Sequence, residues 1–198
     1  YNISITLDTT SPSTFRFINP TRSNNTNSSN TTLDLAFQFS ESNPDTAFLQ
    51  VGFPSGTYTN YTATPSSGIA RYSLSSLSDG IHNFSMFAND TSNNQGTNST
   101  LYKINIDTTS PTSLRFISPT KSNNTDSVNS TLDLAFQFTE TNPHISQIQI
   151  GFPNGTYENR TSSTSGNTGT LALRGLENGL HNFTMFANDT AGNQATNT

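Results

Sequence analysis

Asparagine followed two residues later by Ser or Thr is the pattern in this chain with the most definite chemistry. Such a sequon accepts an N-linked glycan on the side-chain amide. Ten of the fourteen sequons form five pairs 99 residues apart, and those at Asn2, Asn27, Asn98 and Asn154 have no partner. The alternative is an Asn-rich surface that carries no modification. We predict a glycosylated surface, with candidate sites at Asn2, Asn24, Asn30, Asn60, Asn83, Asn89, Asn98, Asn123, Asn129, Asn154, Asn159, Asn182 and Asn188.

Acidic residues offer a second possible chemistry, the binding of calcium. Asp8, Asp90, Asp107 and Asp189 fall around the expected domain ends, where a calcium ion could stiffen a joint by binding several oxygens at once. Asp before Thr or Ser also forms turns between its side chain and the backbone, and the chain has no dense Asp-x-Asp run. We therefore predict turns at these positions, with no metal and no other cofactor.

The histidines do not form a repeated pattern of the kind that metal binding or catalysis needs. His82 and His181 each follow the Gly of a turn by two residues, which predicts a partly buried ring with a backbone hydrogen bond. His144 has no counterpart in the other repeat. No Gly-rich phosphate loop or paired-carboxylate spacing is present either. The sequence therefore predicts no catalytic residue, no cofactor-binding residue and no enzyme.

The elements that would position these residues come from an internal repeat. The segment from Leu101 to Pro111 closely matches Asn2 to Pro12, and Asp107 follows Asp8 by 99 residues, half of the 198-residue chain. We predict a first repeat over residues 8–106, a second over 107–198, and a donor or linking strand over 1–7.

Apolar and polar residues alternate throughout both repeats, as in strands with one buried face. The clearest case spans 33–39, where Leu and Phe alternate with polar or small residues, and it recurs over 132–138. About seven such segments fill each repeat, with turn residues between them and no helical period. The sequence predicts an all-β chain of two tandem immunoglobulin-like β-sandwich domains.

Composition excludes several classes of partner. Only 11% of residues are charged, the formal net charge is -5, and no cluster of Lys and Arg exists for nucleic acid to bind. No stretch of about 18 apolar residues is present, so this segment is not expected to insert into a membrane. Fourteen phenylalanines supply the apolar area that a disordered chain would lack, and the absence of cysteine excludes disulfides.

Three motifs resemble those of the immunoglobulin-like repeats of bacterial and archaeal surface proteins. They are Asp-Thr-Thr-Ser-Pro after each strand at the repeat start, Leu-Ser-Asp-Gly-Ile-His-Asn-Phe over 77–84, and Ala-Asn-Asp-Thr-Ala-Gly-Asn over 187–193. The resemblance implies an extracellular or cell-surface protein of prokaryotic origin. It also implies a likeness to subunits of extracellular filaments, built by donated strands or by tandem repeats.

The repeat boundaries suggest how such a filament would assemble. The second repeat reaches Thr198 before any counterpart of 101–107, whereas 1–7 has no repeat before it. We expect Ile3, Ile5 and Leu7 to complete the second sandwich of another identical chain, head to tail, in a homopolymer. Burying three aliphatic side chains would contribute at most about 5–9 kcal/mol. The predicted function is that of a structural subunit of a glycosylated extracellular filament.

Two alternatives remain at this stage. Residue 198 could instead be joined covalently to a further repeat, which would give a long tandem array with the same fold. The chain could also be an adhesin or carbohydrate-binding stalk module, with Tyr58, Tyr61 and Tyr157 stacking on sugars. The simpler interpretation of these tyrosines is that they cover sheet edges.

Overall fold

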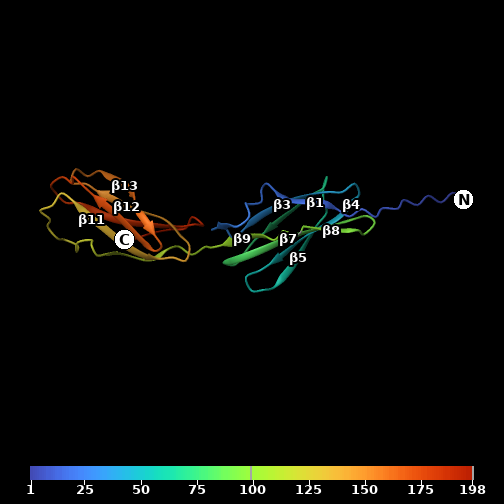
Figure 1. Cartoon of the computed structure of the whole chain (residues 1–198), viewed down its shortest axis with the longest axis horizontal. Helices are drawn as coiled ribbons and strands as arrows, with labels where there is room; N and C mark the ends of the chain where they lie inside the picture. Colours follow the sequence, from blue (N-terminus) through green and yellow to red (C-terminus); the bar gives the residue numbers. More distant parts are fainter. Residues whose placement is uncertain (99, 198) are drawn as a thin grey trace. The chain divides into compact units, whose positions relative to one another are not determined.

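The computed structural model describes residues 1–98 and 100–197. The chain divides into two compact units, Tyr1–Thr108 and Thr109–Thr198, and each is built from strands packed as a sandwich (Figure 1). This confirms the predicted all-β fold. None of the described residues belongs to a helix that is long and apolar enough to cross a bilayer.

The first unit packs a three-stranded sheet against a larger one. The smaller sheet has the order β1 (Ser13–Ile18), β3 (Leu33–Ser40) and β6 (Ile69–Leu74). The larger sheet has the order β2 (Thr26–Ser28), β9 (Tyr102–Ile106), β7 (Gly80–Asp90), β4 (Pro44–Gly52) and β5 (Tyr58–Ala63), and β8 (Gln95–Thr97) also pairs with β7.

The second unit repeats this plan with two four-stranded sheets. One has the order β10 (Thr112–Ile117), β11 (Leu132–Thr139), β15 (Thr168–Leu173) and β14 (Ser163–Ser165). The other has the order β13 (Tyr157–Thr161), β12 (Pro143–Gly151), β16 (Asn182–Asp189) and β17 (Gln194–Thr196).

The alternating segments bury their apolar faces as predicted. In β3, Leu35, Phe37 and Phe39 are buried, and in β11 their counterparts Leu134, Phe136 and Phe138 are buried too. Such burial of large side chains is the main source of stability in a sandwich.

The structure has short strands that were not predicted, among them β2, β8 and β14. The expected last strand of the first repeat, over 101–107, forms as β9, and β8 precedes it. Between them the Asn98 side chain replaces a strand partner, because its Oδ1 accepts a hydrogen bond from the Met86 N–H at 2.8 Å. The short β2 was not predicted, because its three polar residues carry no alternating pattern.

The N-terminal segment forms no strand in this chain. Ile3, Ile5 and Leu7 are 82%, 85% and 85% exposed, and Figure 1 shows this stretch as an extended trace that leaves the first sandwich. The predicted donor or linking strand over 1–7 would form in a second copy or repeat, so it stays a prediction. Apolar alternation makes a segment competent to form a strand, but a strand also needs a hydrogen-bonded neighbour.

Candidate functional site

The place occupied by β9 in the first unit is the most informative site in the molecule. β9 pairs antiparallel with β7 on one side and parallel with β2 on the other. Ile104 lies opposite His82 and Ile106 opposite Gly80, and both isoleucines are 1% exposed or less. β9 therefore closes the core and is hydrogen-bonded along both of its edges.

Side chains and loops fix the ends of β9 in its place. The Lys103 N–H donates to Asn24 Oδ1 at 2.8 Å, and the N–H of Asp107 donates to the Ser28 carbonyl at 2.9 Å. Just beyond the strand, the Thr108 N–H and hydroxyl donate to the carboxylate of Asp79. These contacts set the register of the strand independently of its apolar side chains.

The second unit has no counterpart of β9 among residues 109–197. There β16 pairs with β12 and β17 alone, and residues 125–127, which correspond to β2, form no strand. Several side chains that are buried in the first unit have only partly buried counterparts. The pairs are Leu33 and Leu132, Leu77 and Leu176, and Phe84 and Phe183.

With no counterpart of β9 among residues 109–197, Phe183 of β16, Leu132 of β11 and Leu176 stay partly accessible. Ser28, which is fully buried beside β9, corresponds to the exposed Ser127. A separate opening of about 240 Å³ is lined by Phe152 and Leu176, among others. We call the strip beside β16 that corresponds to the position of β9 the open edge.

A histidine lies at this position in both units. His82 is fully buried, its Nδ1 lies 3.1 Å from the Gly80 carbonyl, and its ring meets Phe53 edge-on at 5.6 Å. Burial lowers the pKa of His82. His181 makes the corresponding contact to Gly179 at 3.2 Å but stays partly exposed. The predicted partly buried ring with a backbone contact is confirmed for His181, and His82 is more deeply buried.

Comparison with known proteins gives the family. The family model described as "Bacterial Ig-like domain (group 3)" matches residues 68–198. The chain belongs to this family. No curated protein sequence matches this bacterial Ig-like chain.

Several solved structures resemble the Ig-like chain at low identity. The fibronectin(III)-like modules of Clostridium thermocellum CbhA are 13% identical with a TM-score of 0.47, and the match covers 93% of this chain and 90% of that one. A 1.5-MDa bacterial ice-binding adhesin is 19% identical with a TM-score of 0.41, covering 86% and 57%. A tetra-tandem repeat from the extending region of a large adhesion protein is 20% identical with a TM-score of 0.37, covering 96% and 48%. The chain thus spans about half of the two adhesion structures.

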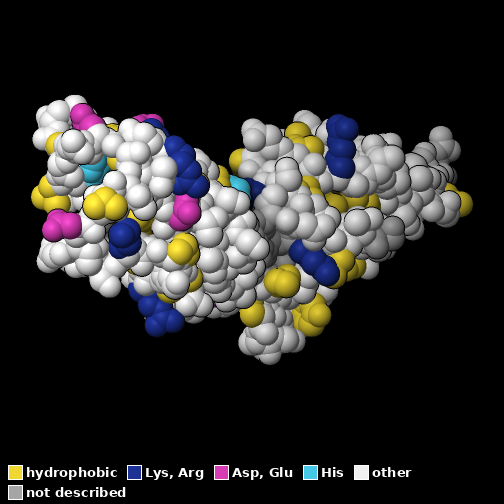
Figure 2. Space-filling view, turned by 60° about the vertical axis from the view of Figure 1, so that its left-hand side comes forward, with side chains coloured by type: hydrophobic (Ala, Val, Ile, Leu, Met, Phe, Trp, Pro, Cys, Tyr) yellow, Lys and Arg dark blue, Asp and Glu magenta, His cyan; other side chains and the backbone are white. Residues whose placement is uncertain are grey.

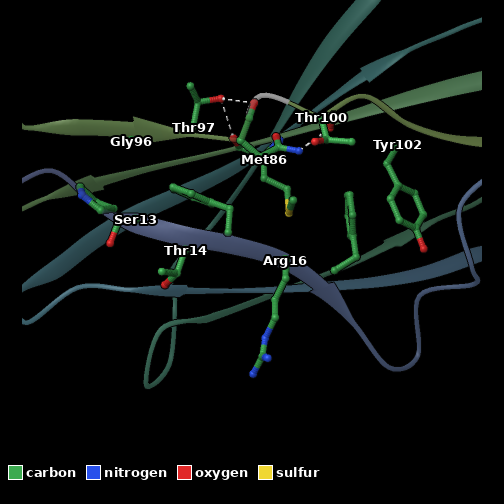
Figure 3. Close-up of a pocket in the computed structure, with 12 residues that line it drawn as sticks. Ser13, Thr14, Arg16, Met86, Gly96, Thr97, Thr100 and Tyr102 are labelled. Atoms are coloured by element: carbon green, nitrogen blue, oxygen red, sulfur yellow. Dashed lines mark hydrogen bonds between the residues drawn. The ribbon is translucent and has the colours of Figure 1, made fainter.

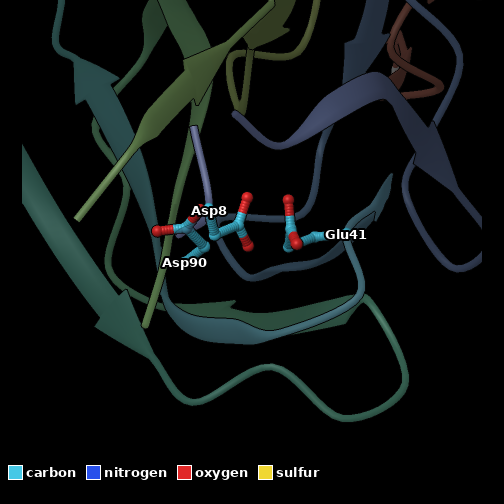
Figure 4. Close-up of side chains that lie close together, drawn as sticks. All are labelled: Asp8, Glu41 and Asp90. Carbon is cyan, nitrogen blue, oxygen red and sulfur yellow. The ribbon is translucent and has the colours of Figure 1, made fainter. Parts of the chain in front are cut away.

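An acidic cluster lies in the first Ig-like unit, where the carboxylates of Asp8, Glu41 and Asp90 face one another (Figure 4). One oxygen from each lies within 4.8 Å of the others, so the three could hold a cation. Burial alone would raise the pKa of the Asp90 carboxyl, but hydrogen bonds from Asn94 and Ser92 outweigh it and lower the pKa. The sequence pointed to the two aspartates at domain ends but missed Glu41.

The internal repeat could have pointed to Glu41 as a candidate residue. The residue recurs as Glu140, in each case two residues before an Asn-Pro pair. In the structure the Glu41 carboxylate also accepts hydrogen bonds from the N–H groups of Ser42 and Asn43, so it forms a turn of the expected kind. The prediction that no metal binds stays a prediction.

The candidate glycosylation sites differ in accessibility within the Ig-like units. Asn83, Asn89, Asn98 and Asn188 are half-buried. The exposed sites are Asn2, Asn24, Asn30, Asn60, Asn123, Asn129, Asn154, Asn159 and Asn182.

The two members of one sequon pair differ most clearly. Asn182 is exposed, whereas the Oδ1 atom of Asn83 is buried. Asn83 is therefore less accessible to a glycan than Asn182. In the first unit β9 lies alongside, with Lys103 opposite Asn83, and the second unit has no such neighbour among its described residues.

Tyr58 and Tyr157, on the edge strands β5 and β13, cover backbone of the neighbouring inner strands. A Cβ on Gly52 would come 2.8 Å from the Tyr58 ring, and one on Gly151 would come 3.0 Å from Tyr157, so each ring lies over a glycine of the neighbouring strand. The two tyrosines remain 65% and 68% exposed, and Tyr61 is 36% exposed. Their outer faces stay accessible to a flat ligand.

An opening of about 540 Å³ in the first Ig-like unit lies between β1 and the β8–β9 region (Figure 3). Its apolar lining includes Phe17, whose ring lies 4.3 Å from that of Tyr102, and Met86. The Arg16 guanidinium points away from this space and donates to Gln38 at 2.8 Å. Among the described residues that line it, Arg16 is the only charged one.

Charged side chains are few and separate on the surface in view in Figure 2, where Lys and Arg are interspersed with Asp and Glu. Single charges of both signs give no extended field of one sign.

Proposed function

We propose that this chain is a structural subunit of a glycosylated filament at or outside the cell surface of a prokaryote. Residues 1–7 of one copy form a strand on the open edge of the second unit of another copy. The observation that carries the proposal is that the same chain has both an exposed apolar segment and an uncovered sheet edge. The segment matches β9 at a spacing of 99 residues, and the edge matches the position that β9 covers.

The proposed register follows from the pairing of β9 with β7. The residues of β9 are replaced by their equivalents in 1–7, and those of β7 by their equivalents in the second unit. The added strand would run antiparallel to the start of β16 and parallel to residues 125–127, as β9 does with β7 and β2. Its apolar side chains would enter the core, and Ser4 and Thr6 would face outward. The predicted pairs are Leu7 with Gly179, Ile5 with His181, and Ile3 with Phe183.

The free energy of burying apolar side chains favours such an addition. Each of the three aliphatic side chains is more than 80% exposed, and burying them contributes at most about 5–9 kcal/mol before the cost of ordering the segment. New main-chain hydrogen bonds would also satisfy groups along the open edge. Head-to-tail contacts of this kind produce fibres when the rotation from one copy to the next does not close a ring.

A charge placed inside the proposed joint tests the idea. We expect Ile5→Asp to abolish fibre formation, because a carboxylate cannot be buried opposite His181 without a large desolvation cost. Ser4→Asp introduces the same charge on the outward face and should leave fibres intact. Sedimentation and electron microscopy of the two purified variants provide the measurement. Fibres from Ile5→Asp as abundant as those of the parent chain would contradict strand addition.

Denaturing electrophoresis of native fibres separates this proposal from a covalent tandem array. A noncovalent fibre formed by the 198-residue chain should yield a single peptide of 21.4 kDa after glycan removal. A species far above that mass, without a ladder, would instead show that the neighbouring repeat is joined by a peptide bond.

A second candidate function is that of an adhesin or carbohydrate-binding stalk module. The observation that favours it is the exposure of Tyr58 and Tyr157 at equivalent positions of the two units, since aromatic faces can stack on sugar rings. Binding of the monomeric chain to a glycan array, lost in Tyr58→Ala with Tyr157→Ala, would support this function. If the chain binds no glycan on the array, this function is contradicted.

A further inference from the structure

Three sequons of each unit lie on one outer sheet surface, which we call the glycan face, and two of them share a further contact. In the first unit Asn60 on β5 pairs with Gln50 of β4, and Asn89 on β7 pairs with Thr46 of the same strand. The neighbours of Gln50 along β4, Leu49 and Val51, are fully buried and point to the core. Because side chains alternate along a strand, Asn60 and Asn89 project from the opposite, solvent-facing surface.

A glutamine anchors the side-chain oxygen of each of these asparagines. The Gln50 Nε2 group donates to Asn60 Oδ1 at 3.2 Å, and Gln95 donates to Asn89 Oδ1 at 3.1 Å. The second unit repeats both contacts at 3.1 Å and 3.0 Å, from Gln149 to Asn159 and from Gln194 to Asn188. An amide held by its oxygen on an outer sheet surface presents its nitrogen, the atom that accepts a glycan, in a fixed direction.

Asn98 shows the contrasting arrangement. Its Oδ1 accepts the Met86 N–H at 2.8 Å, and its Nδ2 donates to the Thr100 carbonyl at 2.5 Å. Both ends of this half-buried amide are thus used in closing the gap between β8 and β9. Moving it outward to accept a sugar would leave the Met86 N–H without its partner.

We propose that Asn60, Asn89, Asn159 and Asn188 carry N-linked glycans on the glycan faces and that Asn98 carries none. In the reaction, the Asn Nδ2 forms a bond to C1 of a sugar that a lipid phosphate or pyrophosphate carries. The bond from C1 to the phosphate oxygen breaks, the carrier phosphate leaves with the electron pair, and Nδ2 loses one proton to a base. The outer surface of the β1–β3–β6 sheet has no sequon on its strands and stays bare.

These positions also protect a sheet edge. β5 and β13 are edge strands of their sheets, and each carries one of the four asparagines near its middle. A bulky polar group there blocks the pairing of edge with edge that exposed strands invite. This consequence rests on the proposed function. Blocking the β13 edge would direct strand addition to the open edge, on the side of β16 away from β13. The assignment of the four sites does not depend on it.

Peptide mapping by mass spectrometry of the protein isolated from the cells that make it tests the assignment. We expect the peptides with Asn60, Asn89, Asn159 and Asn188 to carry the mass of a glycan and the peptide with Asn98 to be unmodified. Unmodified Asn60 and Asn159, or an Asn98 occupied as fully as they are, would overturn the proposal. Occupancy is read from peptide masses whether or not fibres form, so failure of the filament model would be seen separately.

Two matched variants made in the same cells sharpen the test. Thr62→Val removes the sequon hydroxyl without touching Asn60 and should abolish the glycan on that residue. Thr59→Val makes the same change on the same strand outside the sequon and should leave occupancy unchanged. Equal occupancy of Asn60 in the two variants would overturn its assignment as an N-glycan site.

The edge-protecting role has its own measurement. Thr62→Val combined with Thr161→Val removes both edge glycans, and we expect at least a several-fold faster rise of light scattering than with Thr59→Val. An unchanged rate would overturn edge protection and leave the site assignment to the mass data.

Discussion

The two units have nearly the same strands but differ in how much of their cores is closed. Among the described residues, the buried cluster of the first unit contains sixteen apolar side chains and that of the second contains eight. The differences include Ile104 and Ile106 of β9 and the side chains that β9 covers. Leu77, for example, is 5% exposed, whereas Leu176 is only partly buried. Similar local sequences can therefore reach different burial, because a strand distant in sequence decides whether the core is closed.

The largest expected effect comes from supplying the second unit with its missing strand. A chain extended after Thr198 by a copy of residues 1–8 would place the apolar pattern of Ile3, Ile5 and Leu7 where β9 lies in the first repeat. We expect the second unit to gain up to about 5–9 kcal/mol of unfolding free energy. Scanning calorimetry should then show the transition of the second unit moving up toward that of the first. An unmoved transition would mean that the open edge does not accept this strand.

A smaller effect separates two equivalent isoleucines. Ile104→Ala should destabilise the first unit by about 2–5 kcal/mol, because it removes a fully buried side chain. Ile5→Ala should leave the monomeric chain almost unchanged, since Ile5 is 85% exposed. Urea unfolding of both variants checks the difference. A large loss from Ile5→Ala in the monomer would mean that the segment already packs within its own chain.

A third difference concerns packing inside the sandwiches. Ala47 and Ala70 of the first unit correspond to Ser146 and Gly169 of the second. A Cβ on Gly169 would lie 2.5 Å from the Phe136 ring and 2.6 Å from the Ser146 hydroxyl. Gly169→Ala should therefore cost about 1–3 kcal/mol of unfolding free energy.

Adding Ser146→Ala to Gly169→Ala should recover part of this loss, because Ala at both positions already coexists in the first unit. Urea unfolding of the single and double variants measures the coupling. Additive losses would show that the serine hydroxyl does not occupy the space of the missing methyl group.

The smallest expected effect is a dependence on pH in the first unit. Burial lowers the pKa of His82 below its value of 6.5 in the unfolded chain, so the unfolded chain binds the proton more readily. Stability is then full above pH 6.5 and falls as the pH is lowered from there toward the folded-state pKa. His82→Gln should flatten the decrease in unfolding free energy between pH 7 and pH 5. An equally steep decrease in this variant would assign it to other groups.

Much of the fold could be predicted because its strands alternate strictly. The segment 33–39 became β3 with Leu35, Phe37 and Phe39 in the core, as a period of two requires. β2 could not be predicted in this way. It is a polar Thr-Asn-Ser segment whose strand character depends on parallel pairing with β9, more than seventy residues later.

The candidate sites were only partly predictable for the same reason. The sequence supplied Ile3, Ile5 and Leu7 and the sequons, because these are local patterns. It gave no indication that Asn98 closes a gap between two strands or that Glu41 comes close to Asp8 and Asp90. Those relations depend on how distant loops pack, which a single sequence does not reveal.

The double pairing of β9 has a mechanical consequence. The chain leaves the first unit directly after β9, so tension applied through the following residues runs along this strand. Ladder hydrogen bonds lie across the strand direction, and those to β7 and β2 would be loaded in shear and share the force instead of peeling apart in turn. In the proposed filament, a donated strand in the same register would also be loaded in shear. It would therefore resist pulling as β9 does within the first unit.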